Sequence, residues 1–164
     1  MSLSAFQSMI AELGQSIGAA DMAAGDDGYV GLKIDDRDLH VQYEPEDDVV
    51  VLFARLQEVE PDRRAAIYSM LLAANVFWQA TLGATFSADF DTGRIFLADR
   101  RDRAGMDLES LSSWIERFAN VVALWWDRIE SADEGGPLGT QVDEAPATTP
   151  GIPPDGMPPG GTFA

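Results

Sequence analysis

Residues Leu71 to Leu97, with the sequence LLAANVFWQATLGATFSADFDTGRIFL, decide the fold because they combine a helix, its end and the start of a β-hairpin. The apolar residues from Leu71 to Trp78 predict the last turns of a helix. Gly83 stands where a left-handed C-terminal cap ends a helix. From Ala84 to Phe90, apolar and polar side chains then alternate, which predicts a strand.

The sequences on either side of that strand predict a second strand and a helix. Asp91-Thr92-Gly93 is a turn sequence, and Arg94 to Asp99 predicts the returning strand. On the N-terminal side, Pro61 suits the first turn of a helix that we expect from about Asp62 to Leu82. Apolar residues nearly encircle this helix, so it is either central to the core or packed against a second subunit.

The N-terminal third predicts one helix and three strands. The first helix is predicted by apolar residues that recur at spacings of three and four, with Ser2 or Ser4 as its N-terminal cap. These residues are Leu3, Phe6, Ile10, Leu13 and Ile17. Alternating residues between Val30 and Tyr43 predict an antiparallel hairpin around Asp35 to Asp38. Val49 to Leu56 is apolar almost throughout, which predicts a third strand covered on both faces.

The C-terminal third predicts a long helix and a tail. After Asp107 as cap, a regular stripe runs along one helix face through Leu108, Leu111, Ile115, Phe118, Val122, Trp125 and Ile129. Residues 133–164 hold seven of the nine prolines and no basic residue, so we expect a disordered, acidic tail beyond a domain of residues 1–132. The predicted order is α-β-β-β-α-β-β-α, an α+β fold with an antiparallel sheet and three helices.

This order, together with "LLxAN" near the helix end, "LGAT", the turn Asp91-Thr92-Gly93 and a strand that ends in an arginine pair, resembles the class I type III secretion chaperone family. Members of that family are small acidic homodimers that hold the N-terminal segment of a secreted effector in extended form and catalyse nothing. The resemblance therefore implies the same fold, a homodimer and a non-catalytic role in keeping an effector soluble and competent for export.

The resemblance also implies site residues. The first helix and the last hairpin would line the effector groove, through Phe6, Ile10, Leu13, Phe86, Ile95 and Phe96. The second helix would form the dimer contact, through Met70, Phe77 and Trp78. Apolar stripes usually face a domain interior, so an intramolecular core is the alternative for each of these residues.

Composition narrows the classes of partner. The net charge is −17, with 28 acidic against 11 basic residues, so contact with nucleic acid or an anionic membrane would be repelled. No apolar run is long enough for a membrane span, and the N-terminus lacks the basic region of a signal peptide. We therefore expect a cytoplasmic protein with no membrane insertion, whose partners are proteins.

The residues favour no enzyme class. There is no cysteine, His40 is the only histidine, and no phosphate-binding loop or nucleophile motif occurs, so no catalytic residue, cofactor or metal ligand is predicted. Asp91-Thr92-Gly93 spells the aspartic protease triplet, but between two strands it is ordinary turn chemistry. The interpretation is a bacterial secretion chaperone whose expected partners are an effector and secretion apparatus components. A binding or regulatory module of the same fold that serves no secretion is the alternative.

Overall fold

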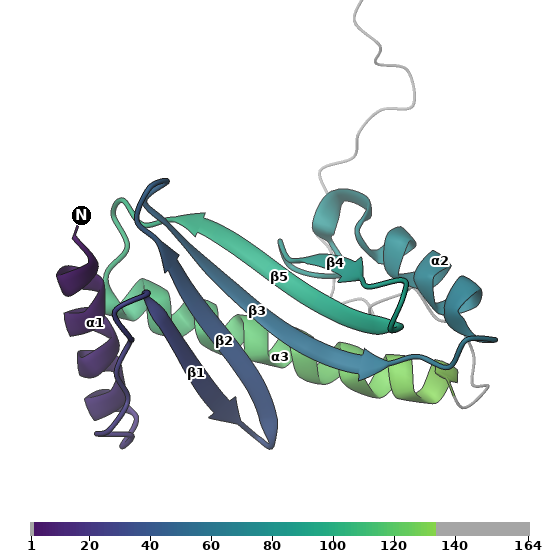
Figure 1. Ribbon diagram of the computed structural model, residues 1–164, viewed down its shortest axis with the longest axis horizontal. Coiled ribbons are helices and arrows are strands. Elements are labelled where there is room, and N and C mark those ends of the chain that lie inside the picture. The colour runs from purple at the N-terminus through teal and green to yellow at the C-terminus, as the bar shows by residue number, and fades with distance from the viewer. Residues whose placement is uncertain (1, 134–164) are drawn as a thin grey trace, which may run out of the picture.

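The computed structural model describes residues 2–133, so the tail predicted from residue 133 onward lies almost wholly outside the described residues. In the described part, the elements follow the predicted order (Figure 1). They are α1 (Leu3–Ser16), β1 (Tyr29–Ile34), β2 (Arg37–Glu44), β3 (Val49–Glu58), α2 (Arg64–Ala74), the short 3₁₀ helix η1 (Val76–Trp78), β4 (Thr85–Ala88), β5 (Arg94–Asp102) and α3 (Leu108–Asp133).

The five strands form one antiparallel sheet in the order β1-β2-β3-β5-β4. The predicted α+β class and antiparallel sheet are confirmed. This order places β1 and β4 at the two edges of the sheet, and the long strands β3 and β5 lie side by side between them. The β1–β2 and β4–β5 hairpins therefore lie at opposite edges of the sheet (Figure 1).

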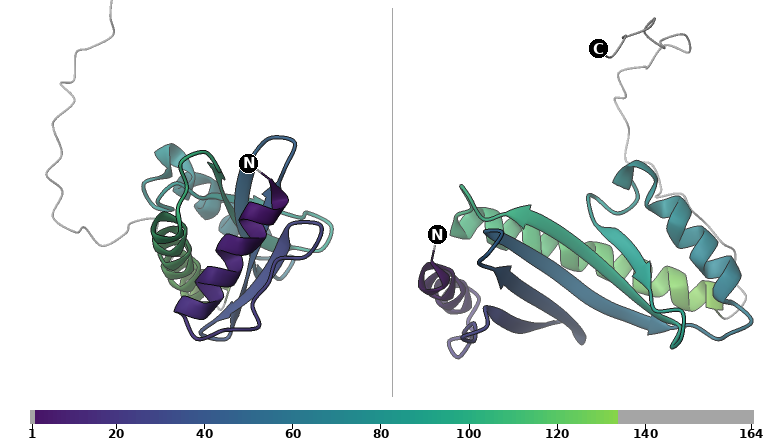
Figure 2. Two further views of the ribbon diagram at one scale, coloured as in Figure 1. Left: turned by 90° about the vertical axis from the view of Figure 1, so that its left-hand side faces the viewer. Right: turned by 45° about the horizontal axis from the view of Figure 1, so that its top comes forward.

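The core lies between one face of the sheet and α3, which runs along the sheet from the α1 side to the α2 side (Figures 1 and 2). The predicted stripe of α3 faces this core, since every member from Leu111 to Ile129 is buried. Asp107 caps the helix as predicted: its carboxylate accepts a 2.8 Å hydrogen bond from the Ser110 amide. That bond, with the Ser110 hydroxyl, lowers the pKa of Asp107.

The second helix ends earlier than its apolar sequence predicts. The α-helix stops at Ala74, and Phe77 and Trp78 have φ angles of 55° and 54°, in the left-handed region. The physical reason is Asn75, whose side chain bonds to β4 instead of facing solvent from a continuing helix. Gly83 has the positive φ predicted for it, 106°, but it ends a series of turns and not the helix itself.

The β1–β2 and β4–β5 turns both depend on aspartates. Asp35 and Asp36 occupy the two-residue turn between β1 and β2 with positive φ, which short polar side chains tolerate better than bulky ones. In the β4–β5 turn, the Asp89 carboxylate accepts a 2.7 Å hydrogen bond from the Thr92 hydroxyl and a 3.0 Å bond from the Asp91 amide. These bonds, with the Thr92 hydroxyl the largest cause, lower the pKa of Asp89. The protease-like triplet is thus part of a turn.

The second face of the sheet is only half covered, so the prediction for the third strand is right for one face alone. Val51 and Phe53 are half-buried there, whereas their neighbours Val50 and Leu52 are buried. His40 lies on the same face, stacked between Tyr29 and Phe53, and its Nδ1 is 2.7 Å from the Tyr29 hydroxyl. This second face is only half covered because α3 packs on the opposite face of the sheet.

Candidate functional site

The β4 edge of the sheet is closed by a side chain. The Asn75 amide donates a 3.2 Å hydrogen bond to the Phe86 carbonyl, and the Phe86 amide donates a 2.8 Å bond to Asn75 Oδ1. Asn75 therefore uses both of its polar groups as a neighbouring strand would, and it satisfies the outward backbone groups at the centre of β4. An edge strand with paired backbone groups is a poor template for another chain.

The β1 edge has no such cap in residues 2–133. The Gly28 carbonyl accepts from the Tyr43 amide of β2, and backbone groups of an antiparallel strand alternate in direction. The backbone groups of Gly31 and Lys33 therefore point away from β2. The Tyr29 carbonyl also points away from β2, but it accepts a hydrogen bond from the Gly25 amide. The accessible edge therefore begins after Tyr29. Two residues of β1 remain available for pairing with an extended chain.

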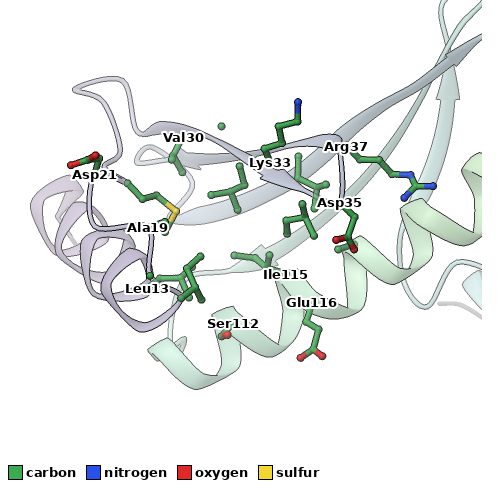
Figure 3. A pocket seen from close by; sticks show the side chains of 18 of the residues that line it. Leu13, Ala19, Asp21, Val30, Lys33, Asp35, Arg37, Ser112, Ile115 and Glu116 are labelled. Atoms are coloured by element: carbon green, nitrogen blue, oxygen red, sulfur yellow. The ribbon is translucent and has the colours of Figure 1, made fainter.

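A cavity of about 1090 Å³ lies beside this open edge. Figure 3 shows its walls: the end of α1, the loop after it, β1 and the first half of α3. Its lining is apolar where these elements meet, through Leu13, Met22, Val30, Leu32, Ile34, Leu39, Ile115 and Ala119. The cavity is large enough to hold several apolar side chains from a partner.

Charges of both signs stand at the rim of the β1 cavity. Lys33 and Arg37 extend from the β1–β2 hairpin, and Asp21, Asp35 and Glu116 stand opposite or beside them (Figure 3). Arg37 is already paired with Asp127 at 3.3 Å. A mixed polar rim around an apolar floor favours a peptide with alternating apolar side chains and gives no strong preference for one charge.

A second apolar surface lies at the other side of the molecule. We call it the α2 patch, and it consists of the exposed side chains of Leu72, Val76, Phe77, Trp78, Leu82 and Phe90. Phe77 is 80% exposed and Trp78 53% exposed, and both have a backbone conformation that costs bulky residues free energy. Exposed aromatic side chains on a strained backbone make the α2 patch a candidate protein contact surface.

The predicted effector residues do not form one site in this structure. Phe6, Ile10 and Leu13 are buried under the sheet, and of these only Leu13 reaches the lining of the β1 cavity. Phe86 and Ile95 are buried near the opposite edge, where Phe86 packs on Trp125 with ring centroids 4.9 Å apart. Phe96 is half-buried on β5. The assignment of these six residues to an effector groove stays a prediction.

The predicted dimer residues are also divided between the core and the surface. Met70 is buried in the core, whereas Phe77 and Trp78 are the exposed centre of the α2 patch. Sequence reasoning missed Asn75 as the cap of β4 and the loop Ile17–Ala23 as a cavity wall. Asn75 carried a signal, since a polar residue inside an apolar helix end needs a partner. The loop carried none.

Within residues 2–133, no helix combines the length and the apolarity that a membrane span requires. No curated protein sequence matches the chain significantly.

Solved structures share the fold. The ExsC–ExsE complex contains a chain with 18% identity and a TM-score of 0.67, matched over 77% of this chain and 95% of that chain. The HopA1–SchA chaperone–effector complex gives 13% identity and a TM-score of 0.61, over 77% and 98% of the two chains. The type III secretion chaperone SycH of Yersinia pestis, in complex with a fragment of YscM2, gives 17% and 0.56, over 73% and 98%.

The family match is broader evidence than any single structure. Residues 8–125 match the model of the Tir chaperone protein (CesT) family, from within α1 to near the end of α3, and so include both edges of the sheet. The chain belongs to the Tir chaperone protein (CesT) family.

Proposed function

We propose that this protein is a type III secretion chaperone that binds the N-terminal segment of a secreted effector in extended form and keeps it soluble and competent for export. The observation that carries the proposal is the open β1 edge beside an apolar cavity. Family membership and the chaperone–effector complexes among the similar structures support it. The role is non-catalytic, because binding alone performs it.

The geometry suggests how an extended client would bind. Main-chain groups of the client pair with the outward groups of Gly31 and Lys33, which gives affinity independent of sequence. Client side chains on one face of the added strand enter the β1 cavity, where Leu32 and Ile115 form part of the floor. Alternation of apolar and polar residues in the client then sets the register.

The α2 patch is the proposed homodimer contact. Phe77 and Trp78 present large exposed rings, and such residues carry most of the free energy at protein interfaces. A dimer through this patch leaves the two β1 edges free, because β1 and the α2 patch lie on opposite sides of the sheet (Figure 1). We further propose a bacterial cytoplasmic location, with components of the secretion apparatus as additional partners.

The six groove residues expected from the family resemblance have different roles in this proposal. Leu13 contacts a client directly, since it lines the β1 cavity. Phe6 and Ile10 act indirectly by fixing α1 on the sheet; Phe6 stacks on Tyr43 with ring centroids 5.1 Å apart. The hairpin residues Phe86, Ile95 and Phe96 would contact only a client that continues around the molecule to the other edge.

Co-expression tests the proposal. The full chain is produced with secreted proteins of the same genome, each shortened to its N-terminal segment, and the products are analysed by size exclusion with light scattering. We expect a soluble complex of two chaperone chains with one segment that is insoluble alone. A dimer that binds none of the segments would contradict the proposal and favour a binding module of the same fold without an export partner.

A further inference from the structure

A row of stacked rings crosses the second face of the sheet and ends at the open β1 edge. His40 on β2 and Phe53 on β3 stand opposite each other in the strand register, with ring centroids 4.8 Å apart and ring planes at 23°. Tyr29 on β1 continues the row, 5.8 Å from the His40 ring and at 24° to it. The Tyr29 side chain is 37% exposed. The last ring of the row is therefore accessible where a client strand would add.

Gly31 gives the Tyr29 ring its place in this row. In the β1–β2 register it is Gly31 that stands opposite His40, and side chains come close in such a pair because its backbone groups point away from β2. The Tyr29 hydroxyl reaches over the glycine to within 2.7 Å of His40 Nδ1. Within residues 2–133, that hydroxyl oxygen, at 3.4 Å, is the only atom beyond its chain neighbours that a Cβ on Gly31 would meet within 4 Å. The space over Gly31 is otherwise open.

A strand added to β1 places one of its side chains in this space. Leu32 lines the β1 cavity on the core side of the sheet, so its neighbour Gly31 belongs to the second face. Residues that face each other on adjacent strands project to the same face of a sheet. The client residue opposite Gly31 therefore projects beside the Tyr29 ring, and the client residues before and after it project toward the cavity.

An aromatic side chain fits this position best. It can lie across Gly31, because a glycine on one strand leaves room for a ring from the next strand. It would meet Tyr29 as one more ring of the row, and aromatic pairs gain free energy beyond the burial of their area. The next client position on this face differs, since it meets Lys33, which points away from the cavity and faces Asp38 in the register (Figure 3). The place for a ring is thus confined to the position opposite Gly31.

We propose that Tyr29 selects clients with an aromatic residue opposite Gly31 in the segment that adds to β1. The preferred segment has apolar residues at every second position, directed into the β1 cavity, and an aromatic residue between two of them on the other face. Tyr29 is the specificity-determining side chain, and Gly31 provides the room beside it. The inference rests on the proposed function, because it specifies the client of the same site.

Three capped peptides test the inference on the full chain. They are Lys-Leu-Thr-Leu-Tyr-Leu-Thr-Leu-Lys and the same sequence with leucine or threonine in place of tyrosine. Each peptide is titrated into the isotope-labelled protein, and the shifts of the β1 amide signals give its dissociation constant. We expect the tyrosine peptide to bind about three- to tenfold more tightly than the threonine peptide, which is the gain of one aromatic pair. The leucine peptide should lie between them, because leucine buries apolar area without a ring.

Two variants remove the proposed selection. Gly31→Val fills the space over the glycine and should reduce the preference for tyrosine over threonine to about twofold or less, although valine suits a strand better than glycine does. Tyr29→Val removes the ring and should have the same effect. Lys33→Val is the matched control, because Lys33 projects from the same face of the same edge strand; this variant should keep the preference. Thermal unfolding verifies that the variants are folded.

Equal affinity of the three peptides at β1 would overturn the inference and leave strand addition standing. A tyrosine preference that persists in both Gly31→Val and Tyr29→Val would also overturn it, since the ring would then bind elsewhere. No shift at β1 with any of the peptides would contradict strand addition itself, and the inference with it. The order of the peptides on the parent chain decides the inference even where a variant fails to fold.

Discussion

The two edges of the sheet differ in how their backbone groups are satisfied. At β4, the side chain of Asn75 pairs with both groups of Phe86, and the apolar surface beside it projects outward as the α2 patch. At β1, Gly31 and Lys33 have outward groups without a cap in the described residues, and the apolar surface beside them is concave. The difference teaches that the two edges suit different contacts, and it matches the two that we propose: a homodimer contact at the α2 patch and an extended client at β1.

The largest expected effect concerns the α2 patch. Phe77→Asn with Trp78→Asn should raise the dimer dissociation constant by two to three orders of magnitude, since each interface hot spot contributes about 2 kcal/mol or more. Asparagine tolerates the left-handed backbone at both positions, so the fold should persist. Sedimentation velocity measures the change.

Ile17→Asn is the matched control at the other edge, because Ile17 is 59% exposed and Trp78 53% exposed. It should leave the dimer intact and weaken client binding. If it dissociates the dimer while the patch variant does not, the two contacts have been assigned to the wrong edges.

The second effect concerns the cap of β4. Asn75→Ala leaves the Phe86 amide and carbonyl without their partner and should lower the free energy of unfolding by about 1–3 kcal/mol. Urea denaturation measures this loss. The variant also creates a second open edge, so it should aggregate more readily than the parent chain. Unchanged stability would show that water replaces Asn75 without cost, and the contrast between the edges would fail.

The third effect concerns the main chain of β1. Lys33→Pro removes one outward amide without breaking the ladder to β2, because proline is tolerated where an edge strand faces away from its neighbour. Loss of one hydrogen bond, about 1 kcal/mol, should weaken client binding about fivefold. Lys33→Ala removes the charge alone and should retain the affinity. Calorimetry on the co-expressed client segment separates the two variants, and equal affinities would exclude strand addition at β1.

The smallest effect is a pH dependence at the β4–β5 turn. Hydrogen bonds from Thr92 and Asp91 lower the pKa of Asp89 below its ordinary value of 3.8. A lowered folded-state pKa means that the stabilisation is complete above 3.8 and is lost as the pH falls through the lower folded value. Asp89→Ala should therefore reduce stability at neutral pH and less so at acidic pH. Urea titrations at several pH values measure this, and a parallel pH profile in both proteins would contradict it.

Much of the fold could be predicted from the sequence because its periodicities are local. The stripe of α3 from Leu111 to Ile129 and the alternation around Val41 each identify a buried face without knowledge of the rest. The end of α2 could not be predicted in this way. The helix ends at Ala74 because the side chain of Asn75 bonds to Phe86 on β4. A contact between two different elements leaves no periodic pattern in the sequence.

The site was less predictable than the fold, for a physical reason. Apolar side chains such as Phe6 and Ile10 look alike in sequence whether they face a core or a groove. The β1 cavity exists because the loop after α1 stands apart from α3, and only the assembled chain shows that gap. The exposure of Trp78 could be anticipated, because the helix expected from about Asp62 to Leu82 carried more apolar residues than one sheet can cover.

Amide hydrogen exchange on the chaperone, with and without the co-expressed client segment, tests the central claim most directly. The account predicts that the client slows exchange at Gly31 and Lys33 and in the lining of the β1 cavity, while Thr85–Ala88 exchanges unchanged. Slower exchange at β4 and the α2 patch, with β1 unaffected, would contradict it.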